Sequence, residues 1–270
     1  MNGTRARRDK LQMLMRSLKL PGFASCFEEE AERASRDGWT CDQYLLRLAE
    51  IEIEQRRVRK ITRAQKRSGL PTGKTLGNLE LNLLPAKVRR QTPALCEGDF
   101  LHRAQNILVF GLPGRGKSHL VCAVGNELIQ RGYQVLFTPT GRLVQRLLAA
   151  KRDLLLEREL RRLDVFDAVI LDDIGYIQQD REEMEVLFTF LSERYERKSV
   201  MLTSNLVFSQ WDRIFKDPMT TAAAVDRLVH HSIILELNGD SYRTKEAEKR
   251  SGRKKKPPRK EEGKETISIT

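Results

Sequence analysis

GLPGRGKS, residues 111–118, follows the apolar run NILVF (106–110) and precedes HLVCAVGNELIQRG (119–132). The octet fits the pattern G-x-x-x-x-G-K-S/T without a mismatch, in the strand, loop and helix context that a phosphate-binding loop requires. Its glycines let backbone N–H groups converge on phosphate oxygens at a helix N-terminus, whose dipole favours anions. A glycine-rich turn is the alternative, but the complete pattern favours a nucleotide site. The residues expected to bind the nucleotide are Gly111, Leu112, Pro113, Gly114, Arg115, Gly116, Lys117, Ser118 and His119.

Two residues of the octet carry the chemistry. Lys117 is expected to reach the β and γ phosphates, and the hydroxyl of Ser118 to ligate Mg²⁺. The chain contains no N-K-x-D stretch for guanine, so ATP is the expected nucleotide. A small-molecule kinase would need an acceptor-substrate site, and the sequence shows no obvious one.

Paired aspartates end a second apolar run, in FDAVILDDIGY (166–176). Asp172 is expected to act on Mg²⁺ through its waters, as the carboxylate at a strand end does in phosphate-loop enzymes. Asp173 is expected to orient and deprotonate the attacking water. Paired aspartates also occur in turns and helix caps. The phosphate loop elsewhere in the chain favours the catalytic interpretation.

A third polar strand end occurs in VMLTSN (200–205). A polar side chain on a strand adjacent to both others can bind the γ-phosphate or the water. We assign this role to Asn205, with Thr203 or Ser204 as substitutes. An Asn in an ordinary turn is the alternative.

Short apolar runs separated by amphipathic stretches fill the second half of the chain. This alternating pattern is typical of an α/β domain with a parallel sheet covered by helices on both faces. The strands expected are residues 106–110, 134–138, 168–172, 200–204 and 232–237.

A small helical domain is expected before the α/β domain. Apolar residues at 11, 14, 15 and 18 predict an amphipathic helix ending at the turn pair Pro21-Gly22, and further helices are expected over 23–35 and 41–67, the last with Asp42 as a candidate cap. We interpret residues 68–105 as a connector that packs onto the next domain. The predicted division is a helical domain (1–68), an ATPase domain including the connector (69–242) and a basic, unstructured tail (243–270).

Charge and composition bear on the partners. The chain has 270 residues, with 49 Lys and Arg against 37 Asp and Glu, a formal charge of +12 that favours a nucleic-acid partner. Neither a secretory leader nor a run of 18 apolar residues is visible, so no membrane partner and a cytoplasmic location are expected.

One helical face in the long third helix suits DNA. Arg56, Lys60, Arg63 and Arg67 fall at i, i+4, i+7 and i+11, so they form a stripe about 16 Å long on one helical face. Such a stripe suits phosphates, and contacts mainly to phosphates give salt-sensitive binding with little sequence choice. A solvated helix face is the alternative.

The motifs GLPGRGKSHL, VILDDIGY, LTSN, AAAVDRLVHHS and GDSYR, with LKLPGFA near the start, resemble the IstB-like ATP-binding proteins. These helper ATPases of insertion sequences are similar to the helicase loader DnaC and the initiator DnaA within the AAA+ class. The resemblance implies an AAA+ P-loop domain and a homo-oligomer with ATP sites at subunit interfaces. It implies a protein that assembles on duplex target DNA, remodels it, recruits and activates a partner transposase, and disassembles on hydrolysis.

The same resemblance implies that Arg227 is an arginine finger acting in trans, and that Arg243 contacts nucleotide or a neighbouring subunit. An ion pair between Arg227 and Asp226 is the alternative. Two other functions stay open at this point: a helicase loader that binds single-stranded DNA, and a nucleotide switch that never touches DNA.

Overall fold

A five-stranded parallel sheet forms the centre of the α/β part of the chain, in the order β2-β3-β4-β1-β5. The computed structural model describes residues 2–174, 181–206, 211 and 228–237, so Arg227, Arg243 and the tail lie outside the described residues. All five expected strands are confirmed. They are β1 (Asn106–Phe110), β2 (Val135–Pro139), β3 (Ala168–Ile174), β4 (Ser199–Ser204) and β5 (Ser232–Glu236).

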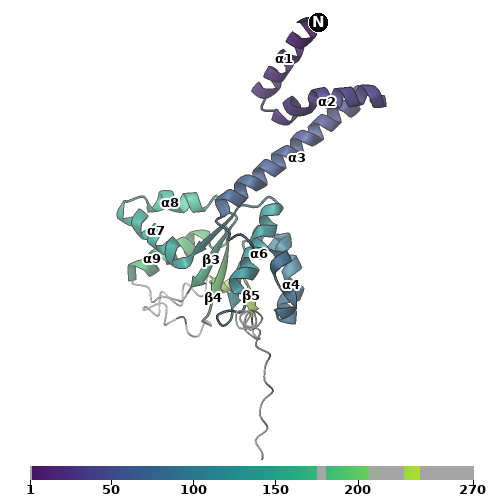
Figure 1. Ribbon diagram of the computed structural model, residues 1–270. Helices are drawn as coiled ribbons and strands as arrows, with labels where there is room; N and C mark the ends of the chain where they lie inside the picture. Colours follow the sequence, from purple (N-terminus) through teal and green to yellow (C-terminus); the bar gives the residue numbers. More distant parts are fainter. Residues whose placement is uncertain (1, 175–180, 207–210, 212–227, 238–270) are drawn as a thin grey trace, which may run out of the picture.

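Helices cover both faces of the sheet (Figure 1). The helices α4 (Ala86–Glu97) and α6 (Lys117–Gln130) pack on one face, while α7 (Thr140–Arg152), α8 (Leu156–Leu163) and α9 (Arg181–Arg194) pack on the other. Alternate residues of each strand enter the two cores, as Ile107 and Leu108 do in β1. The apolar strands in the sequence are explained by this burial on both faces.

The strand order brings three strand ends together. β4 lies between β1 and β3, with Ser204 opposite Phe110 on one side and Ile174 on the other. Because the strands are parallel, the segments that follow β1, β3 and β4 emerge at the same edge of the sheet. The sequence analysis required the strand before Asn205 to be adjacent to the strands that carry the phosphate loop and the aspartate pair. The strand order β3-β4-β1 meets this requirement.

Three N-terminal helices are present, as expected: α1 (Asn2–Ser17), α2 (Pro21–Asp37) and α3 (Cys41–Ser68). Two details of the prediction were wrong. Pro21 and Gly22 start α2 instead of forming a turn, since proline is favourable in the first helical turn. Thr40, not Asp42, is the N-cap of α3, with its N–H donating to Gln43 Oε1 at 2.9 Å.

A buried carboxylate joins α2 to α3. Glu52 is 3% exposed and accepts a hydrogen bond from the Gly22 N–H at 2.5 Å and one from Arg56 Nε at 2.6 Å. A Cβ at position 22 would lie 2.9 Å from the Glu52 Cα, so only glycine lets the helices approach this closely. The stretch LKLPGFA thus sets the contact between these helices.

The long helix α3 belongs to both parts of the molecule. Its first half packs against α2 and projects away from the sheet (Figure 1). Its last turns pack against α6 and β2, with Ala64 buried in the sheet core and Gln65 Nε2 donating to Asn126 Oδ1 at 3.0 Å. The N-terminal helical part is therefore connected to the α/β part by one continuous helix.

The connector after α3 contains more helix than expected. It forms two short 3₁₀ turns, η1 (Leu76–Asn78) and η2 (Leu81–Leu83), then α4 and α5 (Asp99–His102). Pro93 lies inside α4, a position that costs about 3 kcal/mol in an isolated helix. Burial of Val88, Leu95 and Cys96 in the sheet core outweighs that cost. Among the helices described, none is both long and apolar enough to cross a membrane.

Candidate nucleotide site and basic groove

The phosphate loop joins β1 to α6. Gly111, Gly114 and Gly116 all have positive φ, at 154°, 80° and 85°. A Cβ on Gly111 would lie 2.7 Å from the carbonyl oxygen of Leu237 beside β5. The glycines therefore allow a loop conformation that L side chains would strain, and α6 begins directly after it at Lys117.

The lysine of the motif lies against this loop. Lys117 is 8% exposed, and its Nζ donates to the carbonyl oxygens of Gly111 at 2.7 Å and Leu112 at 3.1 Å. The ammonium group is held at the loop backbone, where a phosphate-binding loop requires a cation.

A threonine hydroxyl links the two aspartates of β3. Thr203 is 1% exposed, and its Oγ1 donates to Asp172 Oδ1 at 2.7 Å. Thr203 Oγ1 also accepts a hydrogen bond from the Asp173 N–H at 2.8 Å. Asp173 has φ of 64°, and the register between β3 and β4 shifts between Leu171 and Ile174. The bulge turns the exposed Asp173 away from the strand while Asp172 stays half-buried.

The Asp172 carboxylate lies near the first turns of α6. Burial raises the pKa of the Cys122 thiol to about 12; the Lys74 charge lowers this pKa and the Asp172 charge raises it. Cys122 is one helical turn after Ser118. Gly125 keeps α6 close to β3, because a Cβ there would lie 2.9 Å from Ile170 Cδ1.

The residues at this edge fit Mg²⁺. A hard cation takes oxygen ligands, and the hydroxyl of Ser118 and the carboxylate of Asp172 are such donors. The bond from Thr203 orients that carboxylate, as outer-shell partners of metal ligands do.

Asn205 comes directly after β4 and is half-buried. Within the described part of the chain its Oδ1 is buried and has no hydrogen-bond partner. The neighbouring Ser204 donates to the Ile174 and Leu206 carbonyl oxygens at 3.1 and 2.9 Å. The sequence offered Thr203, Ser204 and Asn205 as polar residues for this site. In the structure Thr203 contacts an aspartate side chain, which the sequence did not indicate.

The connector lies beside the phosphate-loop helix. His119 contacts the Thr75 carbonyl oxygen at 3.2 Å through Nε2, and Asn126 Nδ2 donates to the Lys74 carbonyl oxygen at 3.0 Å. The start of the connector therefore borders the first three turns of α6.

The basic stripe on α3 lines an open groove. All four predicted residues are exposed. Arg59, which the sequence prediction omitted, lines the groove with them; its i+3 position relative to Arg56 was the available signal. The groove has a volume of about 370 Å³ and also borders β2 and the α8–β3 loop. Its lining residues are Arg56, Arg59, Lys60, Arg63, Arg67, Gln134 and Val165.

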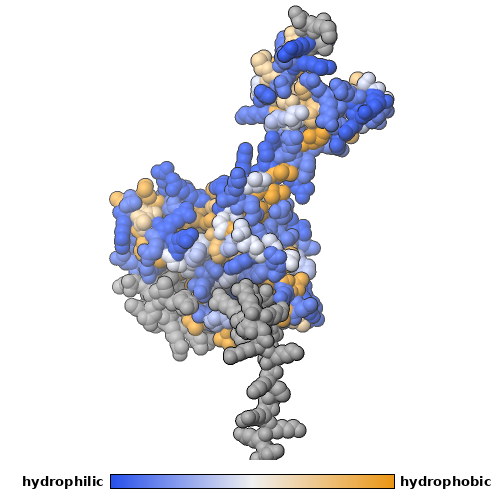
Figure 2. Space-filling view, viewed as in Figure 1, coloured by the Kyte–Doolittle hydropathy of each residue, from blue (hydrophilic) through white to orange (hydrophobic). Residues whose placement is uncertain are grey.

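The groove continues toward α1 and α2. A neighbouring hollow is lined by Arg16, Lys19 and Pro21, together with three arginines of α3. The surface over α3 is mostly hydrophilic (Figure 2). Basic residues from α1, α3 and the turn before α2 thus form one continuous cationic surface, which we call the basic groove.

Two members of the stripe also have structural partners. Arg56 donates to Glu52 and, at 2.7 Å, to the Lys19 carbonyl oxygen. The Arg67 guanidinium lies over the Phe166 ring at 5.5 Å. Lys60 and Arg63 are therefore the members best suited to test nucleic-acid binding.

Comparison with known proteins identifies the family. The model of the IstB-like ATP binding proteins matches residues 13–250. The chain belongs to this family. A Sinorhizobium fredii insertion-sequence ATP-binding protein is 45% identical over 239 residues, covering 88% of this chain and 80% of the relative. The IS21 ATP-binding protein of Pseudomonas aeruginosa is 35% identical, covering 89% of this chain and 91% of the relative.

Solved structures confirm the AAA+ fold. The initiator DnaA bound to AMPPCP and single-stranded DNA superposes with a TM-score of 0.55 at 20% identity, covering 68% of this chain and 57% of that chain. DnaI gives a TM-score of 0.53 at 19% identity, covering 63% of this chain and 96% of that chain. The expected AAA+ P-loop domain behind an N-terminal helical part is confirmed.

Proposed function

We propose that this IstB-like protein is an ATPase that serves as a DNA-transposition helper. It binds ATP and Mg²⁺, oligomerises on duplex target DNA, remodels that DNA and recruits the partner transposase. Hydrolysis of ATP then drives disassembly. The names of its relatives, ATP-binding proteins of insertion sequences, support the transposition context.

The observation that carries the proposal is the meeting of three strand ends at one edge of the sheet. The phosphate loop follows β1, the aspartate pair ends β3, and β4 between them supplies Thr203. In the proposed reaction Lys117 binds the β and γ phosphates, and Ser118 and Asp172 hold Mg²⁺. Asp173, exposed beside them, accepts the proton of the attacking water, and Asn205 orients that water or the γ-phosphate.

The basic groove is the proposed DNA-binding surface. Most contacts there would be to phosphates, because the groove offers arginine and lysine side chains along one helix face. Such binding has little sequence preference and weakens steeply with salt. A helper that accepts many target sites needs binding of this kind.

One experiment tests the function as a whole. The purified full chain is mixed with Mg²⁺, ATP or a slowly hydrolysed analogue, and either duplex or single-stranded DNA, and complex size is followed by sedimentation. We expect large complexes on duplex DNA that persist with the analogue and dissociate as ATP is consumed. Complexes on single strands alone would favour a helicase loader instead, and ATP turnover without DNA binding would favour a nucleotide switch.

A further inference from the structure

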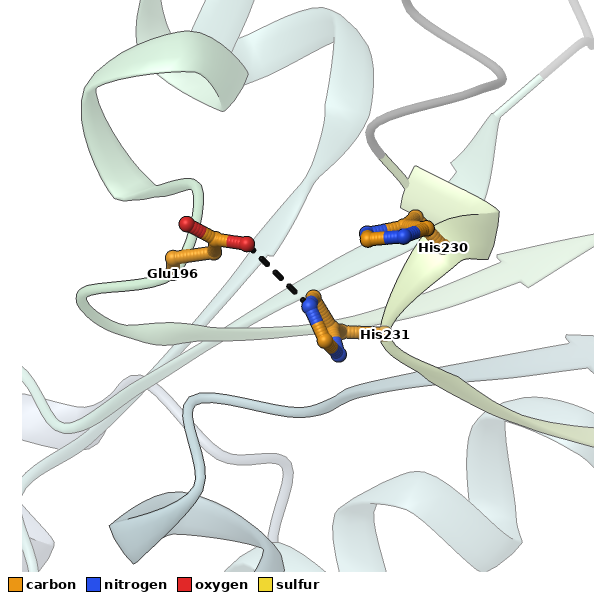
Figure 3. A group of neighbouring side chains, drawn as sticks. All are labelled: Glu196, His230 and His231. Carbon is orange, nitrogen blue, oxygen red and sulfur yellow. Dashed lines mark hydrogen bonds and ion pairs between the residues drawn. The ribbon is translucent and has the colours of Figure 1, made fainter.

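A cluster of potential metal ligands lies away from the nucleotide site. Glu196 is in the turn between α9 and β4, and His230 and His231 directly precede β5. One ligand atom from each residue lies within 4.8 Å of the others, and the two rings and the carboxylate lie around a common space (Figure 3). The cluster is at the amino ends of β4 and β5, whereas the phosphate loop is at the carboxyl ends of the strands.

The backbone on both sides of the cluster is fixed. The His231 carbonyl oxygen accepts the Asn106 N–H at 2.7 Å, which ties it to the start of β1. Glu196 has a positive φ of 55°, and the next residue donates its N–H to the Arg194 carbonyl oxygen at 3.0 Å. Arg194 is itself 2% exposed and donates to the carbonyl oxygens of Phe166 and Ser199 at 2.9 and 3.0 Å. The ligands are thus presented from well-anchored turns.

The side chains already interact. His231 Nε2 lies 3.1 Å from Glu196 Oε1, and His230 Nδ1 lies 3.0 Å from the Tyr195 hydroxyl. The two imidazole rings meet edge to face, with centroids 4.3 Å apart. The hydrogen bond with Tyr195 engages Nδ1 of His230, so Nε2 would be the nitrogen that binds an ion, and Tyr195 would be the outer-shell partner that orients this histidine.

We propose that Glu196, His230 and His231 bind a divalent transition-metal ion, with Zn²⁺ as the best match. Two imidazoles and one carboxylate are a common zinc ligand set that leaves a fourth position for water. Ligands about 2.1 Å from a tetrahedral ion lie about 3.4 Å from each other. The three ligand atoms are already within 4.8 Å of one another, so ion binding would require them to approach by only about 1.4 Å or less. Mg²⁺ prefers oxygen ligands and does not compete well for imidazole.

The ion joins two segments that are far apart in the chain. Residues 196 and 230 are separated by 34 positions, and the stretch between them contains β4. Binding that occurs only in the folded state stabilises it in proportion to metal occupancy. Arg227 is three residues before His230 in the sequence, so the ion anchors the chain next to the proposed arginine finger. The metal site itself does not depend on the proposed function.

Direct metal binding tests this inference. The full-length protein is stripped with chelator and titrated with Co²⁺ and then Zn²⁺, without nucleotide and with excess Mg²⁺ to occupy oxygen sites. We expect one equivalent of Co²⁺ to give visible absorption that one equivalent of Zn²⁺ abolishes. Zn²⁺ should also raise Tm by about 2–4 °C or more, a shift that a domain of this size shows for modest stabilisation.

The variants Glu196→Gln, His230→Gln and His231→Gln should each weaken Zn²⁺ binding at least tenfold and remove the Tm shift. His102→Gln is the matched control, because His102 is also exposed and contacts a tyrosine hydroxyl, that of Tyr133 at 2.9 Å, outside the cluster. Circular dichroism confirms that each variant is folded. Absence of Co²⁺ absorption in the wild type, or equal Zn²⁺ affinity in the cluster variants and the control, would overturn the proposal.

Discussion

Thr203 donates a hydrogen bond of 2.7 Å to the Asp172 carboxylate and accepts one of 2.8 Å from the backbone N–H of Asp173. One buried hydroxyl on β4 therefore fixes both aspartates of β3. The bond to Asp172 sets the orientation of a carboxylate proposed to act on Mg²⁺, and the bond to Asp173 stabilises its left-handed backbone.

Replacing Thr203 should impair hydrolysis more than nucleotide binding. Thr203→Val keeps the side-chain shape but removes both hydrogen bonds, so Mg²⁺-dependent ATP turnover should fall about 10–100-fold. Affinity for ATP in the absence of Mg²⁺ should change little, while Thr203→Ser should retain most activity. Thr92→Val controls for the loss of a buried hydroxyl, since Thr92 bonds only within α4 in the described structure. Unchanged turnover in Thr203→Val would show that the threonine is dispensable.

The role proposed for Asp173 separates binding from turnover. Asp173→Asn should bind ATP with near wild-type affinity but lose turnover by about 10²–10⁴-fold, because the amide cannot accept the proton. Protein–DNA complexes formed with ATP should then persist. Measured ATP affinity, phosphate release and complex lifetime distinguish these effects, and normal phosphate release would assign the base elsewhere.

Arg227 is predicted to act on the ATP site of a neighbouring subunit. Arg227→Ala should lose turnover, as should Lys117→Ala, which removes the cation at the phosphate loop. Mixing the two variants should restore part of the turnover, because a subunit with intact Arg227 completes the site of one with intact Lys117. Phosphate release measured across mixing ratios tests this restoration. If mixtures release no more phosphate than the two variants do separately, Arg227 acts within its own chain.

Salt dependence tests the basic groove. Lys60→Gln combined with Arg63→Gln should weaken duplex binding and reduce the slope of log K against log salt by about 0.9 for each phosphate that the protein no longer neutralises. The double variant Arg57→Gln with Lys87→Gln removes the same charge outside the groove lining. Fluorescence anisotropy at several salt concentrations gives both slopes. If the two double variants have equal slopes of log K against log salt, the DNA does not bind in the basic groove.

Glu52 should make the helical part acid-sensitive. Burial alone would raise the pKa of Glu52, but hydrogen bonds from Arg56 and Gly22 outweigh it, so this pKa lies below its ordinary value of 4.5. The ionised group therefore stabilises the fold above pH 4.5, and this stabilisation is lost as pH falls through 4.5 and the lower folded value. Glu52→Gln should cost about 1–3 kcal/mol at neutral pH and progressively less in acid.

Denaturant unfolding, followed by helix content from neutral pH into acid below the ordinary glutamate pKa, measures this dependence. Glu50→Gln is the control, because Glu50 is on the same helix but exposed, and in the described part of the chain it forms a 3.7 Å ion pair with Arg47. A stability difference between wild type and Glu52→Gln that does not shrink in acid would contradict the explanation.

The sequence predicted the central sheet well because its strands are buried on both faces and therefore appear as uninterrupted apolar runs. It also predicted that GLPGRGKS follows β1 and that Asp172 ends β3, since each lies beside an apolar run, while the roles of these residues stay predictions. The helix α4 was missed because Pro93 opposes helix locally, and only packing of Val88 and Leu95 against the sheet explains it.

The contacts of the candidate site depended on tertiary structure. Asn205, Thr203 and Ser204 are equally polar and adjacent, and only the register of β4 against β3 brings Thr203 to Asp172. Likewise, the pairing of Glu196 with His231 joins residues 35 positions apart, which no local pattern relates.

The 28 residues of α3 form one uninterrupted helix, about 42 Å long. Its last turns are hydrogen-bonded to the phosphate-loop helix through Gln65 and Asn126, while its first half packs against α2 far from the sheet. A stiff rod held at one end amplifies small rotations: a tilt of about 5° at α6 displaces the far end by about 4 Å. The nucleotide binding proposed beside α6 would therefore act on the distant helical part through α3, and the basic groove lies between the α6 contact and the far end of that helix.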